Sequence, residues 1–315
     1  MIELAAIEAA RERIGGAAIR TPLVRLRIDD APADIYLKLE NLQPIGSFKI
    51  RGATNAVMLA PAGDWAAGLV TASAGNMAQG VAWTARELGV PATIAVPEHA
   101  PQAKLAAIER LGGHVRKLPY DDWWNVIVTG RLDGTEGLFV HPVQDHGVMA
   151  GNGTIGLEIL DDLPDPDAVV IPYGGGGLTV GIASAVKALR PEVRVFTAEP
   201  EGGAALAAAM AAGRPVDVDY RATFVDGSGS RRVLDTMWPL ITPLIDGALS
   251  VSVAEVAAAV RLMAERARVI AEGAGALALA AALSGQAGSG TVVCVVSGGN
   301  INLDKLAAIL TGATS

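Results

Sequence analysis

The sequence predicts an α/β protein with two mostly parallel sheets, each flanked by helices. Three observations carry this prediction. The 315 residues exceed the usual size of one domain. Hydrophobic residues make up 51% of the chain but aromatic residues only 4%, and 37 glycines are available for turns; this composition is typical of Ala-rich helices and Val/Ile-rich strands. Short apolar runs bounded by Gly or Pro alternate with helical patterns in two separate groups.

The first group of elements follows an amphipathic helix at residues 1–16. Its period predicts, in order, a strand at 68–73, a helix at 76–88, a strand at 92–97, a helix at 101–112 and a strand at 114–119. This βαβαβ order predicts a parallel sheet with helices on both faces.

The second group begins with a helix at 148–164. It continues with a strand at 167–173, a helix ending at 190, a strand at 193–200, a helical region at 253–283 with a Gly break, a strand at 291–296 and a short terminal helix. Residues 201–250 have no clean period, and we expect loops there. The cleft between the two sheets is the expected place for a site.

Charge and cysteine usage narrow the class of protein. The formal net charge of −8 gives no basic patch for nucleic acid and no polybasic tract for an anionic membrane. The apolar stretch 273–283 is shorter than the roughly 20 residues that span a bilayer, and the N-terminus does not read as a signal peptide. The single Cys294 lies in an apolar run, which favours a buried structural thiol and a reducing compartment. We therefore expect a cytoplasmic protein that acts on small molecules.

A run of glycines predicts an anion site. Gly174, Gly175, Gly176 and Gly177 lie between a strand and a helix, where bare N–H groups and the helix N-terminus can hold a phosphate. Two other interpretations are a plain tight turn and a dinucleotide loop, in which Glu199 would bind the ribose.

Three further stretches favour a different ligand over a dinucleotide. The residues 71–76, TASAGN, form a second strand-to-helix junction that can take a carboxylate, and 297–300, SGGN, closes the last strand. The stretch 46–53, GSFKIRGA, contributes Lys49, an amine that can react with an aldehyde when it is desolvated, as an arginine cannot. A phosphate, a carboxylate and a reactive amine in one cleft suit an amino acid and a phosphorylated aldehyde.

These four stretches, in this order, resemble the fold-type II pyridoxal phosphate (PLP) enzymes, which share a tryptophan synthase beta-like fold. The resemblance is to the branch of the serine/threonine dehydratases (threonine ammonia-lyases) and serine racemases. It extends over nearly the whole chain through HPVQD at 141–145, AGNGTIGLEIL at 150–160, FVDG at 224–227 and EGAGALAL at 272–279. It implies a large cofactor-binding domain, residues 1–52 and 146–315, and a small domain, residues 53–145, that carries the substrate carboxylate loop.

The resemblance also implies roles for individual residues. Lys49 would carry PLP as a Schiff base, next to Phe48. The four glycines would hold the phosphate, Asn76 would bond the 3′ oxygen of the ring, and Ser297 would face the ring nitrogen. A neutral hydroxyl at that nitrogen makes the ring a weaker electron sink, so elimination competes well with transamination.

The implied reaction is the loss of water from a β-hydroxy L-amino acid, L-threonine or L-serine, giving a 2-keto acid and ammonia. The substrate carboxylate would bind at Ser73, Ala74, Gly75, Asn76 and Met77, and Lys49 would act as general base. Racemases of this branch have a serine where this chain has Ala74, which cannot carry a proton, so a dehydratase is favoured.

Several alternatives remain open at this point. Dehydratases usually have a histidine where this chain has Met77, so a bulkier or acidic substrate, such as phenylserine or 3-hydroxyaspartate, is possible. β-Replacement enzymes share the fold, and a nicotinamide-dependent oxidoreductase is the alternative from another class.

The resemblance implies three further properties. Glu199 is a candidate ligand for a divalent or monovalent cation, although Ala205 stands where metal-binding relatives have a second acid. Family resemblance suggests a homodimer. Because the sequence ends at Ser315, soon after SGGN, we expect no feedback domain and no inhibition by isoleucine.

Overall fold

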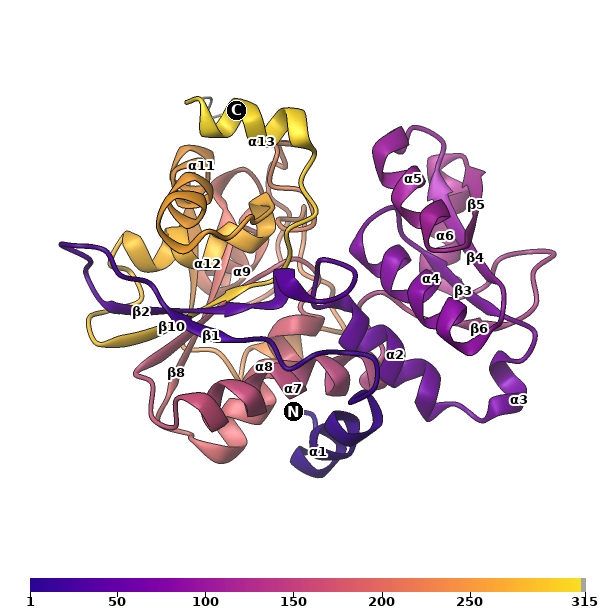
Figure 1. The fold of residues 1–315 in the computed structure, drawn as a ribbon, viewed down its shortest axis with the longest axis horizontal. Coiled ribbons are helices and arrows are strands. Elements are labelled where there is room, and N and C mark those ends of the chain that lie inside the picture. Colours follow the sequence, from indigo (N-terminus) through magenta and orange to yellow (C-terminus); the bar gives the residue numbers. More distant parts are fainter. Residues whose placement is uncertain (313–315) are drawn as a thin grey trace.

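Two sheets organise the protein (Figure 1), whose computed structural model describes residues 1–312. The larger sheet has the strand order β1-β2-β10-β7-β8-β9, and every neighbouring pair is parallel except β1 with β2. The bounds of these strands are β1 Leu23–Arg25, β2 Asp34–Leu39, β7 Ala168–Pro172, β8 Arg194–Pro200, β9 Gly247–Val251 and β10 Thr291–Val296.

Both faces of the larger sheet are buried. In β7, Val169 and Ile171 pack into one core while Ala168 and Val170 pack into the other, as the period of two in a strand requires. Helices cover the first face: α1 Leu4–Arg13, α7 His146–Asp162, α8 Gly177–Leu189, α9 Ala205–Ala212 and α10 Trp238–Ile241. The second face is covered by α11 Val253–Leu262, α12 Gly273–Leu283 and α13 Leu303–Leu310.

The smaller sheet is parallel throughout, in the order β5-β4-β3-β6. Its strands are β3 Leu69–Ala72, β4 Ala92–Pro97, β5 Gly113–Leu118 and β6 Leu138–Phe139. One face packs against α4 Asn76–Leu88 and α5 Gln102–Arg110, and the other against α6 Tyr120–Thr129. Each sheet with the helices that cover it forms one body, the larger body around the six-stranded sheet and the smaller body around the four-stranded sheet. The helix α2, Lys49–Leu59, packs against α7 of the larger body and against α4 of the smaller body. The short α3, Ala62–Trp65, follows α2.

The predicted fold class is confirmed, and so are the strand and helix order of both groups, the N-terminal helix and the C-terminal helix. The expectation of loops at 201–250 was wrong in part, although residues 213–237 have no helix or strand. That segment contains α9, α10 and β9, and β9 pairs in parallel with β8 at the edge of the larger sheet. An edge strand that is only half-buried on most residues shows no apolar alternation, so its sequence gave no signal.

Smaller differences concern other segments. In the helical region 253–283 the first helix, α11, runs into a π-helical turn, Met263–Ala267, and stops at Arg268 with φ 61°. The break therefore comes before Gly273, at which α12 starts. The strands β1, β2 and β6 and the helices α2, α3 and α6 were not predicted. Cys294 is fully buried in β10, where burial raises the pKa of its thiol, as expected of a structural cysteine.

The predicted domain boundaries stay a prediction, although all four strands of the smaller sheet fall between 53 and 145. Residues 313–315, which include the last part of the predicted large domain and the Ser315 end point, lie outside the described residues. Within residues 1–312, the helices are too short or too polar for any of them to cross a membrane.

Candidate active site

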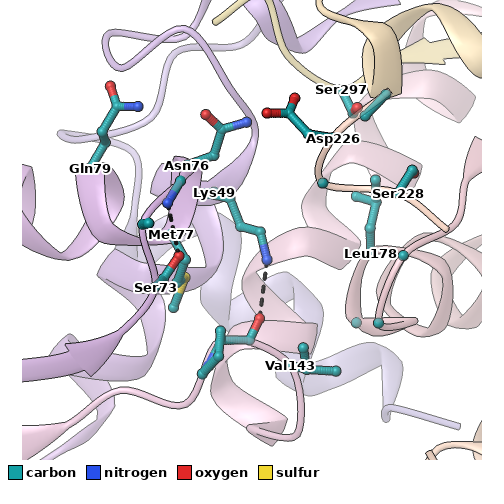
Figure 2. A pocket seen from close by; sticks show the side chains of 18 of the residues that line it. Lys49, Ser73, Asn76, Met77, Gln79, Val143, Leu178, Asp226, Ser228 and Ser297 are labelled. Carbon is teal, nitrogen blue, oxygen red and sulfur yellow. Dashed lines mark hydrogen bonds between the residues drawn. The ribbon is translucent and has the colours of Figure 1, made fainter. Parts of the chain in front are cut away.

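A cavity of about 470 Å³ opens between the two sheets, at the ends of β3, β7 and β10. This is the position expected for a ligand site in parallel α/β sheets, outside the carboxyl ends of the strands. Every cofactor-binding and substrate-binding residue predicted from sequence lines this one cavity: Phe48, Lys49, Ser73 to Met77, Gly174 to Gly177 and Ser297. Figure 2 shows Lys49 between Asn76 and Ser73 on one side and Ser297 and Ser228 on the other.

Lys49 is the first residue of α2, and two contacts with the end of β10 fix the chain just before it. Ser47 pairs with Gly298, and the Phe48 N–H donates to the Ser297 carbonyl at 3.0 Å. The Lys49 ammonium donates to the carbonyl of Pro142 at 3.0 Å and lies 5.2 Å from the centre of the Phe48 ring.

Burial lowers the pKa of Lys49 to about 8. Among the ion pairs of residues 1–312 there is none that involves Lys49, so no carboxylate restores the charged form. At neutral pH a larger fraction of this amine is therefore uncharged and nucleophilic than in an exposed lysine, although the charged form still predominates.

The glycine run forms an open cradle at the N-terminus of α8. Gly176 caps the helix at φ 95°, a conformation that favours glycine, and no side chain bonds the first N–H groups of the helix. A Cβ on Gly174 would lie 2.6 Å from the carbonyl oxygen of Gly227, so this position has no room for a side chain. Bare N–H groups at the positive end of a 13-residue helix suit a phosphate.

The loop Ser73 to Asn76 forms a second, similar junction between β3 and α4. Gly75 caps α4 without a side-chain hydrogen bond to the helix, and its own N–H donates to the Ser73 hydroxyl at 3.2 Å. The N–H groups of this helix end can therefore donate hydrogen bonds to a carboxylate in the same cavity. Met77 is nearly fully buried and belongs both to the cavity wall and to the core of the smaller sheet.

Asn76 also contacts the larger body directly. Its Nδ2 donates to Oε1 of Glu272 at 2.7 Å, and its Oδ1 accepts from Nδ2 of Asn300 at 2.8 Å. Asn300 is the last residue of the SGGN stretch, and Ser297, the first, is buried at the end of β10. Two of the stretches singled out from the sequence are thus linked by side-chain hydrogen bonds.

Sequence reasoning missed three ionisable residues of the cavity: Lys104, Asp226 and Glu272. Lys104 of α5 forms an ion pair with Asp226, which lies in the segment after α9 and so belongs to the other body. Burial raises the pKa of Glu272 to about 7, and the charge of Asp226 adds to this rise. Asp226 and Glu272 fall within FVDG and EGAGALAL, so these motifs were a signal that could have identified them.

Glu199 lies outside the cavity lining, and its side chain caps the N-terminus of α9. Its carboxylate accepts from the N–H groups of Leu206 at 3.1 Å and Ala207 at 3.0 Å, so it caps that helix from the end of β8. Burial raises its pKa to about 7. In the described part of the chain no three His, Cys, Asp or Glu side chains cluster as metal ligands, and cation binding by Glu199 stays a prediction.

The residues present fit PLP. The cavity offers an amine whose pKa is lowered by burial, a helix end without side chains for a phosphate, and a neutral hydroxyl at the end of β10. The second helix end, at Asn76, leaves room for the carboxylate of an amino acid.

Comparison with known proteins gives the same answer. A family model described as "Pyridoxal-phosphate dependent enzyme" matches residues 14–298. An L-threonine ammonia-lyase of Thermotoga maritima is 39% identical over 98% of this chain and 78% of its own length.

Two solved structures extend the comparison to the fold. Maize serine racemase superposes with a TM-score of 0.90 at 32% identity, covering 98% of this chain and 97% of that one. The processed form of threonine deaminase isoform 2 from Solanum lycopersicum gives 0.89 at 33% identity, covering 98% and 92%. The resemblance found in the motifs, and PLP as cofactor, are thereby confirmed: this chain belongs to the family of pyridoxal-phosphate dependent enzymes.

Proposed function

We propose that the protein is an ammonia-lyase that removes water from a β-hydroxy L-amino acid, L-threonine or L-serine, and releases a 2-keto acid and ammonia. The observation that carries the proposal is the placement of Lys49. Its amine, with a pKa of about 8, stands in one cavity with a phosphate cradle and a second helix end free for a carboxylate. The similarity to an L-threonine ammonia-lyase over almost the whole chain supports it.

In this proposal, different residues bind the cofactor and the substrate. The Gly174 to Gly177 cradle holds the cofactor phosphate, and Ser297 presents a neutral hydroxyl to the ring nitrogen. The loop Ser73 to Asn76 holds the substrate carboxylate at the N-terminus of α4. PLP, when bound, supplies an electron-withdrawing ring that stabilises negative charge on Cα.

Lys49 moves the proton. As an uncharged amine beside the substrate it removes the proton from Cα, and its Nζ holds that proton as an ammonium. The electron pair left on Cα forms a double bond to Cβ, and the hydroxyl on Cβ takes up the proton held on Lys49 Nζ and leaves as water. Hydrolysis of the released enamine gives the keto acid and ammonia.

A racemase is the nearest alternative, because maize serine racemase has the same fold. Racemisation requires a second proton donor on the opposite face of Cα. Ala74, which lines the cavity where racemases of this branch have a serine, has no proton to give. This favours elimination. The glycine run alone also left open a nicotinamide-dependent oxidoreductase. That alternative is not supported, because the chain belongs to the pyridoxal-phosphate dependent enzymes.

Met77 bears on the choice of substrate. It places an apolar side chain in the wall of a cavity that Trp123 and Ile127 also line, at a position where a dehydratase would have a histidine. Bulkier substrates such as 3-phenylserine therefore belong in the test. The cytoplasmic location and the homodimer also stay proposals.

The test is keto-acid release by the purified PLP-loaded protein. L-Threonine, L-serine, threo-3-hydroxyaspartate, 3-phenylserine and the D forms are the substrates to compare. We expect release from L-threonine or L-serine, and none from the Lys49→Ala variant, which lacks the base. Keto-acid production by Lys49→Ala, or silence of the wild type on every substrate, would contradict the proposal.

A further inference from the structure

Glu272 is a buried carboxyl in the cavity wall to which the proposed reaction gives no task. It is the residue before α12, its side chain is only 6% exposed, and its Oε1 accepts a hydrogen bond from Asn76 Nδ2 at 2.7 Å. A buried carboxyl of this kind is costly to ionise, so its contact with a residue expected to touch the cofactor needs an explanation.

A backbone carbonyl fixes the direction of every hydrogen bond in this group. Asn300 Nδ2 contacts the carbonyl oxygen of Ile45 at 2.9 Å, and a carbonyl can only accept, so the nitrogen of Asn300 must be on that side. The same nitrogen donates to Asn76 at 2.8 Å, so Asn76 must present its oxygen to Asn300. The nitrogen of Asn76 is left to face Glu272. The orientation of this amide therefore follows from the network.

This orientation decides what Asn76 can offer a ligand. Its Oδ1 is occupied by Asn300, and one of the two hydrogens on Nδ2 is occupied by Glu272. The remaining free hydrogen makes Asn76 a donor toward a neighbouring ligand atom. A donor is what the 3′ oxygen of PLP requires, because that oxygen is an acceptor when it is ionised.

The hydrogen bonds also cross between the two bodies of the protein. Asn76 starts α4, which packs on the smaller sheet, whereas Glu272 and Asn300 belong to segments that follow or precede elements of the larger sheet. Loss of the acceptor at 272 would leave a donor of Asn76 without a partner, and Asn300 alone would then hold its side chain.

Charged groups from several elements surround Glu272. Burial and the charge of Asp226 raise its pKa to about 7, while the hydrogen bond from Asn76, the charge of Lys104 and the Asn300 backbone N–H lower it. Asp226 and Lys104 pair with each other, and Lys49 lines the same cavity. The carboxyl therefore changes between its neutral and its charged form around neutral pH.

We propose that Glu272 is a positioning residue that, together with Asn300, holds Asn76 as a hydrogen-bond donor toward the 3′ oxygen of the cofactor. The inference rests on the proposed placement of PLP in this cavity. Glu272 acts through Asn76, and its state of ionisation changes the strength of the hydrogen bond that holds the amide, since an ionised acceptor bonds more strongly than a neutral one.

The experiment compares Glu272→Leu with Glu272→Gln, using the dissociation constant of PLP and the absorption band of the bound cofactor between pH 5.5 and 8.5. Leucine removes the acceptor that holds Asn76. A hydrogen bond from Asn76 to the charged 3′ oxygen is worth about 1.5–3 kcal/mol, so its loss should make PLP bind about 10- to 100-fold more weakly. Glutamine keeps an oxygen for Asn76 and should recover most of this affinity. It should also abolish the change in the absorption band near pH 7, because it does not titrate.

Two further variants provide a second test and a control. Asn300→Ala changes an exposed residue and so keeps the fold; it frees the oxygen of Asn76 and should weaken PLP binding while the pH dependence remains. Glu199→Gln is the matched control, because Glu199 is also buried with a pKa of about 7 but lies outside the cavity lining; the pH dependence of the band should persist in it.

The outcomes separate this inference from the proposed function. Wild-type affinity and a wild-type absorption profile in Glu272→Leu would overturn the inference alone. So would equal losses in Glu272→Leu and Glu272→Gln, accompanied by equal losses of thermal stability in the apoprotein, since these indicate a structural role. A wild-type protein that shows no absorption band with PLP would overturn both.

Discussion

Replacement of Gly174 by alanine tests the proposed phosphate cradle quantitatively. A Cβ at this position would lie 2.6 Å from the backbone oxygen of Gly227, whereas ordinary contacts of a Cβ begin at 3.4 Å. The two segments must separate by the difference, about 0.8 Å. A hydrogen bond of about 2.9 Å that lengthens by this amount passes 3.5 Å and is lost.

The expected effect follows from the strength of one such bond. A hydrogen bond to a charged group contributes about 1.5–3 kcal/mol, and each 1.4 kcal/mol changes a dissociation constant about tenfold. We therefore expect the dissociation constant of PLP to rise about 10- to 100-fold in Gly174→Ala. The measurement is a titration of the apoprotein with PLP, followed by the absorption of the bound cofactor.

Two other glycines calibrate the result. A Cβ on Gly177 would lie 3.0 Å from the Val143 oxygen, so Gly177→Ala should raise the dissociation constant by a smaller factor. Nothing lies within 4 Å of a Cβ on Gly16, far from the cavity, so Gly16→Ala should bind PLP like the wild type. Equal dissociation constants in Gly174→Ala and Gly16→Ala, with both proteins folded by circular dichroism, would refute the cradle.

Two other predictions concern buried charges. Glu40 and Glu158 lie 2.8 and 2.7 Å from the Arg51 guanidinium, and Arg51→Met leaves both carboxylates in the core without this partner. The substitution should lower the free energy of unfolding, measured in guanidinium chloride, by about 3–5 kcal/mol. A loss below about 1 kcal/mol would contradict this. Glu199 has a pKa of about 7 in the folded protein, against a usual value of 4.5. Between these values the folded protein keeps a proton that the unfolded chain releases, so stability falls as pH rises, by about 3 kcal/mol for this one group. Glu199→Gln should reduce this decline, measured as the difference in thermal midpoint between pH 4.5 and pH 8, and an unchanged difference would exclude the raised pKa as its cause.

The parts of the fold that the sequence predicted are those whose burial leaves a pattern. The core strands β7 and β10 are apolar runs because helices cover both faces of the larger sheet, and such runs are visible without any partner. By contrast, β9 is only partly buried, and in β2 the apolar pattern is interrupted by Lys38, a fully buried lysine. The interruption has a cause far away in the sequence, since Lys38 pairs with Glu158 of α7 at 2.6 Å.

The candidate site divides in the same way. Lys49, the glycine run and the two strand ends have local motifs, because each needs a special backbone or a reactive group at one point of the chain. Glu272 and Asp226 have no such spacing relative to one another. The motifs that contain them, EGAGALAL and FVDG, indicate the family, but the meeting of the two carboxyls in one cavity arises from the packing of α12 and of the segment after α9 around it.

The reactive lysine is distinguished by the partners it lacks. Within 14 positions the chain buries the side chains of Lys38 and Arg51 and places Lys49 in the cavity wall. Glu158 pairs with both Lys38 and Arg51, and Glu40 bonds Arg51 as well, so these two cations are neutralised where they lie. The bonds of Arg51 also hold α2 against the larger body, only half a turn beyond Lys49. Among the described residues Lys49 alone of the three has no carboxylate partner, so its desolvation is uncompensated and its pKa falls to about 8. The same local network that fixes the helix therefore leaves one amine able to act as a nucleophile and a base.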